Sequence, residues 1–360
     1  MRVIQMLPSL SYGDAVGNDV MALDNALRGA GYETGIYAEN IGARVPQGRA
    51  HRISKLPRLK DDDVIIYHLS VGTELNFRLP AFHGRKMIIY HNVTPYEFFS
   101  GYSHNLWQLC KYGLEGVEFL ADKAEYCLAD SEFNKQNLID LGYKCPIDVL
   151  PILIPFDDYK QEPNQGVIER YSDDGYTNLL FTGRVAPNKC HEDIIAAFYQ
   201  YQKNYNEKSR LFLVGNFDER EIYYNKLASF AEKLGLKDKV IFTGHIGFDE
   251  ILAYYHIADA FICMSEHEGF CVPLVEAMFF DIPIIAYDSS AISYTLGGSG
   301  ILIKEKNHLE VAGVIDYLQK HADVKEALLQ GQRERLKDFD NEVIEKQFLK
   351  YLSDYIEGTK

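Results

Sequence analysis

Short apolar segments alternate with longer amphipathic stretches along the whole chain, and this alternation constrains the fold more than any other feature. In the first half the apolar segments cover residues 3–7, 34–37, 64–68, 87–91, 126–129 and 148–150. In the second half they cover residues 178–182, 211–215, 240–243, 260–264, 283–287 and 300–303. Strands of this length separated by helical stretches are typical of parallel sheets with helices on both faces. We therefore expect an α/β protein with two such sheets.

The chain is also too long for one hydrophobic core, because 360 residues exceed the usual size of a single domain. Proline, aspartate, asparagine and glycine cluster at residues 155–166, which indicates a boundary there. We expect a first domain over residues 1–158 and a second over 159–340. The last helical stretch, 341–360, is long enough to cross back and complete the first domain. Ligands of parallel sheets bind beyond the carboxyl ends of the strands, so two Rossmann-like domains would face each other across a cleft.

Composition excludes several classes of protein. A content of 47% hydrophobic and 25% charged residues is typical of a soluble globular protein, and a formal net charge of −15 argues against nucleic-acid binding. No run of 18 apolar residues is present, so no transmembrane helix is expected, and residues 1–7 are too short for a signal peptide. The six cysteines are scattered without a Cys-x-x-Cys pair. They favour reduced core residues in a cytoplasmic protein over disulfides or a zinc site.

The charge is uneven, because residues 44–60 carry six cations and no acid: Arg44, Arg49, Arg52, Lys55, Arg58 and Lys60. Such a stretch can face anionic lipid or a phosphorylated acceptor, which predicts a peripheral contact with the inner face of a membrane. The alternative is an ordinary solvated loop and helix face. Both interpretations stay open.

Two glutamates lie on either side of a turn between an apolar strand and a helix in the second half. The segment 265–278 reads Ser-Glu-His-Glu-Gly-Phe-Cys-Val-Pro-Leu-Val-Glu-Ala-Met, with Glu268 on the turn, Glu276 in the first helical turn and the helix opening at Pro273. The backbone N–H groups between the glutamates stand at the positive end of a helix dipole. An anion site flanked by two carboxylates is typical of a nucleotide-sugar site, whereas surface acids at a helix start are the alternative.

Two cations follow the first strand of the second half. Arg184 and Lys189 lie in the loop after Thr182, and Gly183 and Pro187 shape this loop. Two cations at the carboxyl end of a strand suit a diphosphate, although surface ion pairs are the alternative. Two further strands end in glycine, before Asn216 and His245, and these ends suit the walls of a base and ribose pocket.

The first domain has two candidate loops at strand ends. Residues 12–19 follow the first strand and precede a helix expected over residues 20–28, and Gly17 there would let the backbone approach a phosphate or sugar. Asp19 fits helix-start chemistry better than the role of a base. His91 ends a buried strand, and Pro95 keeps the next residues out of helical space. We therefore expect His91 at the lip of the cleft.

In this order the motifs resemble those of the retaining glycosyltransferases with the GT-B fold, specifically glycosyltransferase family four, the "group 1" glycosyl transferases. The resemblance is strongest over residues 178–303. It implies that Glu276 holds the ribose hydroxyls and Glu268 those of the donor sugar, while Arg184 and Lys189 stabilise the leaving diphosphate without a metal. It also assigns donor contacts to Gly17, Gly183, Gly215, His245, Gly269, Phe270, Cys271 and Val272. Acceptor-side candidates are Asp19, His91 and Asn92, and His91 would also touch the donor sugar.

The resemblance implies no cofactor beyond a nucleotide-sugar co-substrate, a UDP- or GDP-sugar, and a saccharide or lipid-linked saccharide as acceptor in cell-surface polysaccharide or glycolipid synthesis. The pattern departs from many relatives at Ser293 and Tyr294, where an Ile-Pro-Glu stretch is common, and at Asn18, where a second glycine is common. A sugar-nucleotide epimerase of the same architecture is an alternative. A nicotinamide-dependent dehydrogenase is a further alternative, but the chain lacks the glycine fingerprint of that class. A two-domain ligand-binding protein is another, but such proteins usually have a secretion signal, which is not expected here.

Overall fold

A computed structural model describes residues 1–11 and 13–358 of the chain as two compact units. Unit 1 comprises Met1–Glu97, His104–Pro155 and the C-terminal segment from Phe339, and unit 2 comprises Phe98–Ser103 and Phe156–Asp338. The sequence places the boundary after residue 158, and the structure divides the chain slightly earlier, between Pro155 and Phe156.

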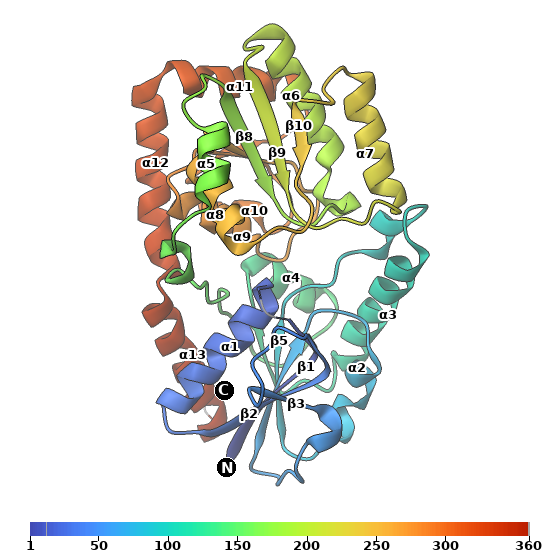
Figure 1. The fold of residues 1–360 in the computed structure, drawn as a ribbon. Helices are drawn as coiled ribbons and strands as arrows, with labels where there is room; N and C mark the ends of the chain where they lie inside the picture. The colour runs from blue at the N-terminus through green and yellow to red at the C-terminus, as the bar shows by residue number, and fades with distance from the viewer. Residues whose placement is uncertain (12, 359–360) are drawn as a thin grey trace. The chain divides into compact units, whose positions relative to one another are not determined.

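Unit 1 contains a parallel sheet of seven strands in the order β3-β2-β1-β4-β5-β6-β7. Figure 1 labels β1, β2, β3 and β5 of this sheet. The strands are β1 (Arg2–Leu10), β2 (Glu33–Ile41), β3 (Ala50–Arg52), β4 (Val64–Leu69), β5 (Arg85–Tyr90), β6 (Tyr126–Ala129) and β7 (Ile147–Val149). Each of the six strands predicted for the first half is present. The short edge strand β3 was not predicted, because only three residues pair there and so short a segment has no recognisable periodic pattern.

Five α-helices belong to unit 1: α1 (Ala15–Gly29), α2 (Glu74–Arg78), α3 (His104–Leu120), α4 (Glu132–Asp140) and α13 (Asn341–Glu357). The last of these, α13, packs on the sheet of unit 1, as the sequence predicts. Its apolar face, Ile344, Phe348, Leu352 and Tyr355, shares one core with residues of β1, β4, β5 and β6. This spacing of three and four residues is that of one helix face.

Unit 2 contains a parallel sheet of six strands in the order β10-β9-β8-β11-β12-β13. The strands are β8 (Thr177–Thr182), β9 (Ser209–Val214), β10 (Val240–Phe242), β11 (Ala260–Cys263), β12 (Ile284–Tyr287) and β13 (Ile301–Ile303). The helices are α5 (Gln165–Tyr171), α6 (His191–Asn204), α7 (Ile222–Lys233), α8 (Phe248–His256), α9 (Val272–Phe279), α10 (Ile292–Leu296), α11 (His308–Lys320) and α12 (Ala322–Leu336).

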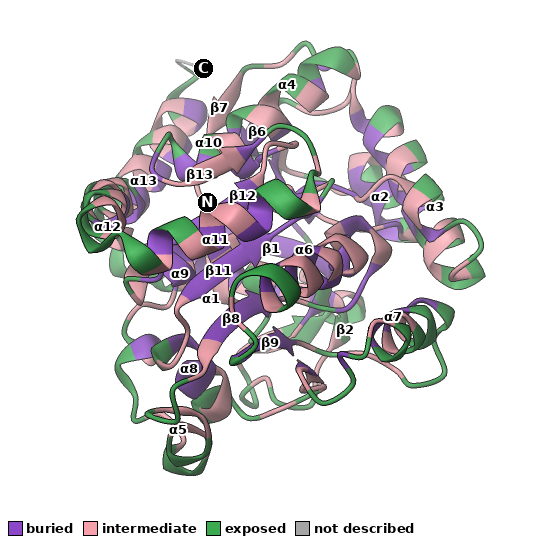
Figure 2. Ribbon diagram, turned by 90° about the horizontal axis from the view of Figure 1, so that it is seen from above, coloured by how far each residue is buried: buried purple, intermediate pink, exposed green. Residues whose placement is uncertain are grey.

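The cores of both units lie on their sheets. Figure 2 shows strands such as β1, β8 and β11 mostly buried, whereas exposed residues gather on the helices and loops. All six cysteines are free thiols, of which five are buried and Cys145 is partly exposed. Within the described part of the chain, no helix combines the length and the apolar character that crossing a membrane requires.

Two helices begin earlier than the sequence predicts. Helix α1 begins at Ala15 instead of residue 20, because the side chain of Asp14 accepts the N–H of Gly17 and caps the helix (Oδ1–N 2.6 Å). Helix α9 begins at Val272 instead of Pro273, because Cys271 takes a left-handed conformation (φ 72°) at the cap position. Both corrections follow from caps that the flanking residues alone do not reveal.

Candidate active site

The strand order of each sheet reverses at one point, and candidate residues follow the strands there. In unit 2 the reversal lies between β8 and β11, which are neighbours although three helices and two strands separate them in sequence. In unit 1 it lies between β1 and β4. Ligands of open parallel sheets bind beyond the carboxyl ends of strands at such points. A ligand site is therefore expected in the loops after these strands.

In unit 2 the loops after β8 and β11 are joined by a buried ion pair. The ammonium group of Lys189 lies 2.5 Å from a carboxylate oxygen of Glu268, whose side chain is 8% exposed. Burial opposes the charge on Lys189, but the carboxylate of Glu268 outweighs this effect and raises the lysine pKa above its ordinary value. Asn188 adds two hydrogen bonds, since its side chain donates to the His267 carbonyl and its carbonyl accepts the N–H of Glu266. The structure thus brings together two residues predicted 79 positions apart.

Arg184 lies in the same loop as Lys189 but has a different environment. Its side chain is exposed, and among the described residues it forms no ion pair. A guanidinium without a protein carboxylate remains available for an anionic ligand, which it can bind through two parallel hydrogen bonds. The loop therefore holds one cation paired with a carboxylate, Lys189, and one without an ion pair among the described residues, Arg184.

The carboxylate of Glu276, in the first part of α9, is held by two tyrosines. Tyr159 donates to one of its oxygens at 2.9 Å, and Tyr255 donates to the other at 2.5 Å. Since the Tyr255 hydroxyl donates its hydrogen bond to Glu276, it accepts a hydrogen bond from the hydroxyl of Thr182 at 2.6 Å. Burial raises the pKa of Glu276, and the two tyrosine hydrogen bonds partly offset that rise. Each oxygen keeps a lone pair for a further donor, so the carboxylate can still accept ligand hydroxyls.

The turn between Glu268 and α9 is fixed by side chains from the segment around α10. Ser290 accepts the backbone N–H of Glu268 at 2.9 Å, and Thr295 donates to the carbonyl of Phe270. The predicted donor contacts Gly269, Phe270, Cys271 and Val272 lie in this turn, directly before or at the start of α9. The left-handed Cys271 costs conformational energy that such local hydrogen bonds help to offset.

Of the remaining predicted donor contacts, two have a structural reason to be glycine. A side chain at Gly215 would collide with the carbonyl of Gly183, because β8 and β9 still pair at this point through the N–H of Gly183 and the carbonyl of Val214. Gly183 itself has a φ of 147°. His245 is exposed and follows β10, the edge strand of the sheet. Their contacts with a ligand stay predictions.

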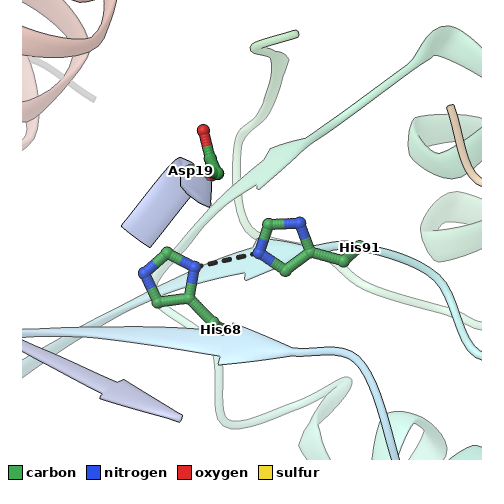
Figure 3. A group of neighbouring side chains, drawn as sticks. All are labelled: Asp19, His68 and His91. Atoms are coloured by element: carbon green, nitrogen blue, oxygen red, sulfur yellow. Dashed lines mark hydrogen bonds between the residues drawn. The ribbon is translucent and has the colours of Figure 1, made fainter. Parts of the chain in front are cut away.

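In unit 1 His91 is buried, contrary to the expectation that it lies at an open lip. Its side chain is 1% exposed, and its Nδ1 lies 2.8 Å from Oδ2 of Asp130. Its Nε2 lies 2.9 Å from Nδ1 of His68, and Figure 3 shows this bond. The strands explain the burial, because His91 follows a central strand, β5, and Asp130 and His68 come from its two neighbours.

Asp19 lies close to this histidine pair. Figure 3 shows it beside His68 and His91, and one ligand atom of each of the three residues lies within 4.8 Å of the others. It is not helix-start chemistry, because Asp14 caps α1 and Asp19 instead accepts the N–H of Leu153 at 2.9 Å. Burial raises the pKa of Asp19 to about 7, although the charge of His91 opposes this rise.

Two further first-domain candidates have local structural roles. Gly17 lies inside α1 and not in a loop, and a side chain there would collide with the carbonyl of Ser11. Asn92 has a left-handed backbone (φ 73°), and its amide donates to Oδ1 of Asn134 at 2.6 Å. Tyr12, part of the predicted loop, lies outside the described residues.

Three groups of side chains have donor atoms close enough for a metal ion, and protein partners already engage each of them. Both ring nitrogens of His91 are taken in the group with Asp19 and His68. Glu268 holds Lys189 in the group with Cys263 and Cys271. In the group of Cys190, Asp193 and Glu266, Lys306 bridges both carboxylates at 2.7 Å. A protein cation therefore stands beside the carboxylates of the last two groups.

Sequence reasoning missed the partners of the predicted residues: Gln5, His68, Asp130, Tyr159 and Tyr255. A signal existed for three of them. Asp130 directly follows a predicted strand, as His91 closes one, and Gln5 and His68 are polar residues inside otherwise apolar strands. The tyrosines carry no such signal, because the chain has 25 of them and their hydroxyl partners depend on packing.

Comparison with known proteins identifies what this arrangement resembles. Residues 169–335 match the family model of the glycosyl transferases group 1. Alpha-monoglucosyldiacylglycerol synthase of Streptococcus pneumoniae (strain ATCC BAA-255 / R6) is 30% identical over 185 residues, which is 50% of this chain and 40% of that relative. The matches with the curated relatives therefore span well under two thirds of their lengths.

Solved structures resemble the chain over almost its whole length. Sucrose-phosphate synthase from Thermosynechococcus elongatus has a TM-score of 0.78 at 18% identity, covering 99% of this chain and 100% of that one. HepE of Anabaena, in complex with UDP and glucose, has a TM-score of 0.75 at 18% identity, covering 98% and 100%. At this identity the likeness shows the fold alone. It confirms the expected class, an α/β protein with two Rossmann-like domains of the GT-B type.

Proposed function

We propose a function for this chain from the match of residues 169–335 to the family model of the glycosyl transferases group 1. It is a retaining, metal-independent glycosyltransferase that moves a hexose-type sugar from a nucleotide donor to a saccharide or lipid-linked saccharide. Unit 2 binds the donor and unit 1 the acceptor. The reaction serves the synthesis of a cell-surface polysaccharide or glycolipid at the cytoplasmic side of a membrane.

The observation that carries this proposal is the pair of cations in the loop after β8. Arg184 is exposed without an ion pair among the described residues, and Lys189 after β8 lies beside Glu268 after β11, the carboxylate that we propose binds the donor sugar. A leaving diphosphate gains negative charge as the glycosidic bond breaks, and preorganised cations stabilise that charge. In this role they replace a divalent metal. Glu276 lies in the same unit, where its two oxygens accept ribose hydroxyls.

The donor is a UDP- or GDP-sugar. The complex of HepE with UDP and glucose, in the same fold, supports a uridine nucleotide. The name of the relative alpha-monoglucosyldiacylglycerol synthase supports a lipid-linked acceptor. Retention of configuration proceeds by front-face attack, with the leaving diphosphate accepting the proton of the acceptor hydroxyl.

The basic stretch 44–60 supports a membrane contact. Of its six cations, Arg49 alone forms an ion pair within the described residues, with Asp24 at 2.6 Å. Arg52, Arg58 and Arg78 line a hollow of about 520 Å³ in unit 1, together with the apolar side chains of Leu56 and Phe82. Arginines that form no ion pair within the described residues, beside apolar walls, suit anionic lipid headgroups, each contributing about 1 kcal/mol near the surface, while Glu39 in the same lining opposes this attraction.

A thermal-shift panel with UDP, GDP, ADP, CMP and dTDP tests the donor class first. A ligand present at about 100 times its dissociation constant stabilises a protein by about 2.7 kcal/mol. The favoured nucleotide then defines the sugar donors for a transfer assay with saccharide and lipid-linked acceptors. No shift with any nucleotide would contradict the proposal. Consumption of the nucleotide sugar without any acceptor, yielding an isomeric nucleotide sugar, would indicate an epimerase instead.

A further inference from the structure

A line of polar side chains crosses four neighbouring strands of unit 1. Gln5 lies on β1 and His68 on β4, while His91 directly follows β5 and Asp130 directly follows β6. These strands are adjacent in this order. The register pairs Gln5 with Ile66 and His68 with Ile89, so His68 and His91 each lie two residues beyond the paired position, on the same face of the sheet, and the four residues form a diagonal line. All four residues are at most 9% exposed. Buried polar atoms need partners, so the hydrogen bonds along this line determine where its protons lie.

The first link determines the orientation of the Gln5 amide. Its Nε2 donates to the carbonyl of Val20 at 3.0 Å, which leaves Oε1 facing Nε2 of His68 at 2.9 Å. The reverse orientation would place the amide oxygen against the Val20 carbonyl, two acceptors without a proton between them. An amide oxygen only accepts, and therefore Nε2 of His68 carries a proton.

The second link determines which nitrogen of His68 is free of a proton. His68 is fully buried, and burial, together with the neighbouring charge of His91, holds its pKa well below the ordinary value. A neutral ring with its proton on Nε2 has a lone pair on Nδ1. This Nδ1 lies 2.9 Å from Nε2 of His91, with ring centroids 5.2 Å apart and planes 7° from parallel (Figure 3). Nε2 of His91 is therefore the donor of this bond.

The third link supplies the second proton of His91. Its Nδ1 faces Oδ2 of Asp130 at 2.8 Å, and a carboxylate accepts. Burial opposes a charge on this ring, but the carboxylate of Asp130 after β6 favours it most, and Asp19 and Asp14 at the start of α1 favour it further when they are ionised. Together they raise the pKa of His91 above its ordinary value. The ring then carries a proton on both nitrogens.

We propose that Gln5 and His68 are positioning residues that hold His91 as a fixed imidazolium, with one N–H spent on Asp130 and the other on His68. Neither ring nitrogen has a lone pair, so His91 acts through its positive charge and not as a general base. The use of that charge rests on the function proposed above, in which a leaving diphosphate becomes more negative during the reaction. A buried cation that needs no reorganisation favours such a charge.

Nitrogen-15 spectroscopy tests the charge directly in the full-length chain. Long-range proton–nitrogen correlation spectra of the imidazole rings distinguish protonated from unprotonated ring nitrogens, and His91→Gln and His68→Asn variants assign the signals. Near neutral pH, we expect two protonated nitrogens on His91 and a single proton, on Nε2, for His68. An unprotonated Nε2 on His91 near neutral pH would overturn the proposal.

Two substitutions at His68 separate its hydrogen bond from its bulk. His68→Leu removes the acceptor for His91, whereas His68→Asn keeps an oxygen near the position of Nδ1. We expect His68→Leu to lower the pKa of His91. Its kcat should fall roughly tenfold, the scale of losing one hydrogen bond to a charged group, with a smaller change in KM for the donor. His68→Asn should show the smaller shift and the smaller loss. Equal His91 pKa values in both variants would contradict the role of His68.

The outcomes separate this proposal from the proposed function. The spectra require no turnover, so a doubly protonated His91 in a chain that transfers no sugar leaves the charge assignment standing and removes the glycosyltransferase function. Sugar transfer by a chain whose His91 is neutral does the opposite. If His68→Leu does not fold, the wild-type spectrum and His68→Asn still decide.

Discussion

The charged candidate residues of the two units differ in whether protein groups bind them. In unit 1 the charges of His91, Asp130 and Asp19 are buried and satisfied by neighbouring side chains or backbone. In unit 2 Arg184 is exposed and has no carboxylate partner among the described residues, although Lys189 in the same loop is paired with Glu268. Around His91 the charges therefore have protein partners, whereas the loop after β8 has one cation, Arg184, without a carboxylate partner among the described residues. Substitutions in unit 1 should consequently change the protonation of buried groups and the pH dependence of stability. Substitutions in unit 2 should mainly change the turnover of the enzyme.

The largest effect is expected at the two cations of unit 2. Arg184→Ala and Lys189→Ala should each lower turnover by roughly 10²–10³-fold, the scale for losing one preorganised donor. Arg184→Ala should leave thermal stability unchanged because its side chain is exposed and unpaired. Lys189→Ala should also destabilise the fold by about 1–3 kcal/mol, since it leaves the buried Glu268 carboxylate without its partner.

Steady-state rates at saturating donor and thermal unfolding measure both effects. Arg220→Ala is the matched control, because Arg220 is an exposed arginine of unit 2 paired only with Asp218 nearby in sequence. Near wild-type rates for either loop variant would remove the proposed role of the β8 loop.

A smaller effect separates the two glutamates of unit 2. Glu276→Gln should weaken binding of the free nucleoside diphosphate by about tenfold or more, because a hydrogen bond to a charged group contributes about 1.5–3 kcal/mol. Glu268→Gln should instead lower kcat more than it weakens that binding, since the donor sugar is absent from the free nucleotide. Calorimetric titration with the nucleoside diphosphate and steady-state kinetics compare the two. Equal losses of nucleotide affinity would show that the carboxylates do not divide the work in this way.

The burial of Asp19 in unit 1 should be visible in how the stability of the fold depends on pH, and not in turnover alone. Its pKa is raised to about 7 in the folded chain from an ordinary 3.8, so the folded state binds more protons than the unfolded state between these values. Stability from this group is present below about pH 4 and is lost as pH rises towards about 7. Asp19→Asn still accepts the N–H of Leu153 but cannot ionise. We expect it to be more stable than the wild type by about 1–3 kcal/mol at pH 8, with the difference shrinking towards pH 4.

Chemical denaturation at several pH values measures this difference. The control is Asp238→Asn, since Asp238 is an exposed aspartate. A stability difference for Asp19→Asn that does not depend on pH would mean that Asp19 ionises normally in the folded chain.

The smallest effect is expected from metal removal. We propose that Arg184, Lys189 and the start of α9 take the place of a divalent cation, so turnover in excess EDTA should equal turnover without it. The assay is initial rate with and without the chelator, followed by addition of Mg²⁺ or Mn²⁺. Loss of activity with EDTA and recovery with either metal would contradict a diphosphate site made only of protein groups.

The sequence predicted unit 2 more completely than unit 1, and particular residues explain why. Arg184 and Lys189 lie in the loop after β8 and Glu268 lies in the loop after β11, and the chain's own order of strand and turn places them at the carboxyl ends of these strands. In unit 1 the sequence predicted His91 but not its environment, because His68 and Asp130 reach it through the pairing of β4, β5 and β6. Gly17 was misplaced because the cap at Asp14 lengthens α1 by a turn. The errors around His91 arise where a contact depends on residues distant in the chain, whereas the error at Gly17 arises from a local cap three residues away.

By itself the sequence determined the local elements: six predicted strands in each half, the helices between them, the return of α13 to unit 1 and the positions of charged residues at strand ends. These features depend on periodicity and on turn residues, which act over a few positions. Only the tertiary structure decided which charges are paired. Strand order places Lys189 beside Glu268, Glu276 beside Tyr159 and Tyr255, and His91 between His68 and Asp130. Burial and hydrogen-bond partners, which set a group's charge, are properties of packing between segments far apart in the chain.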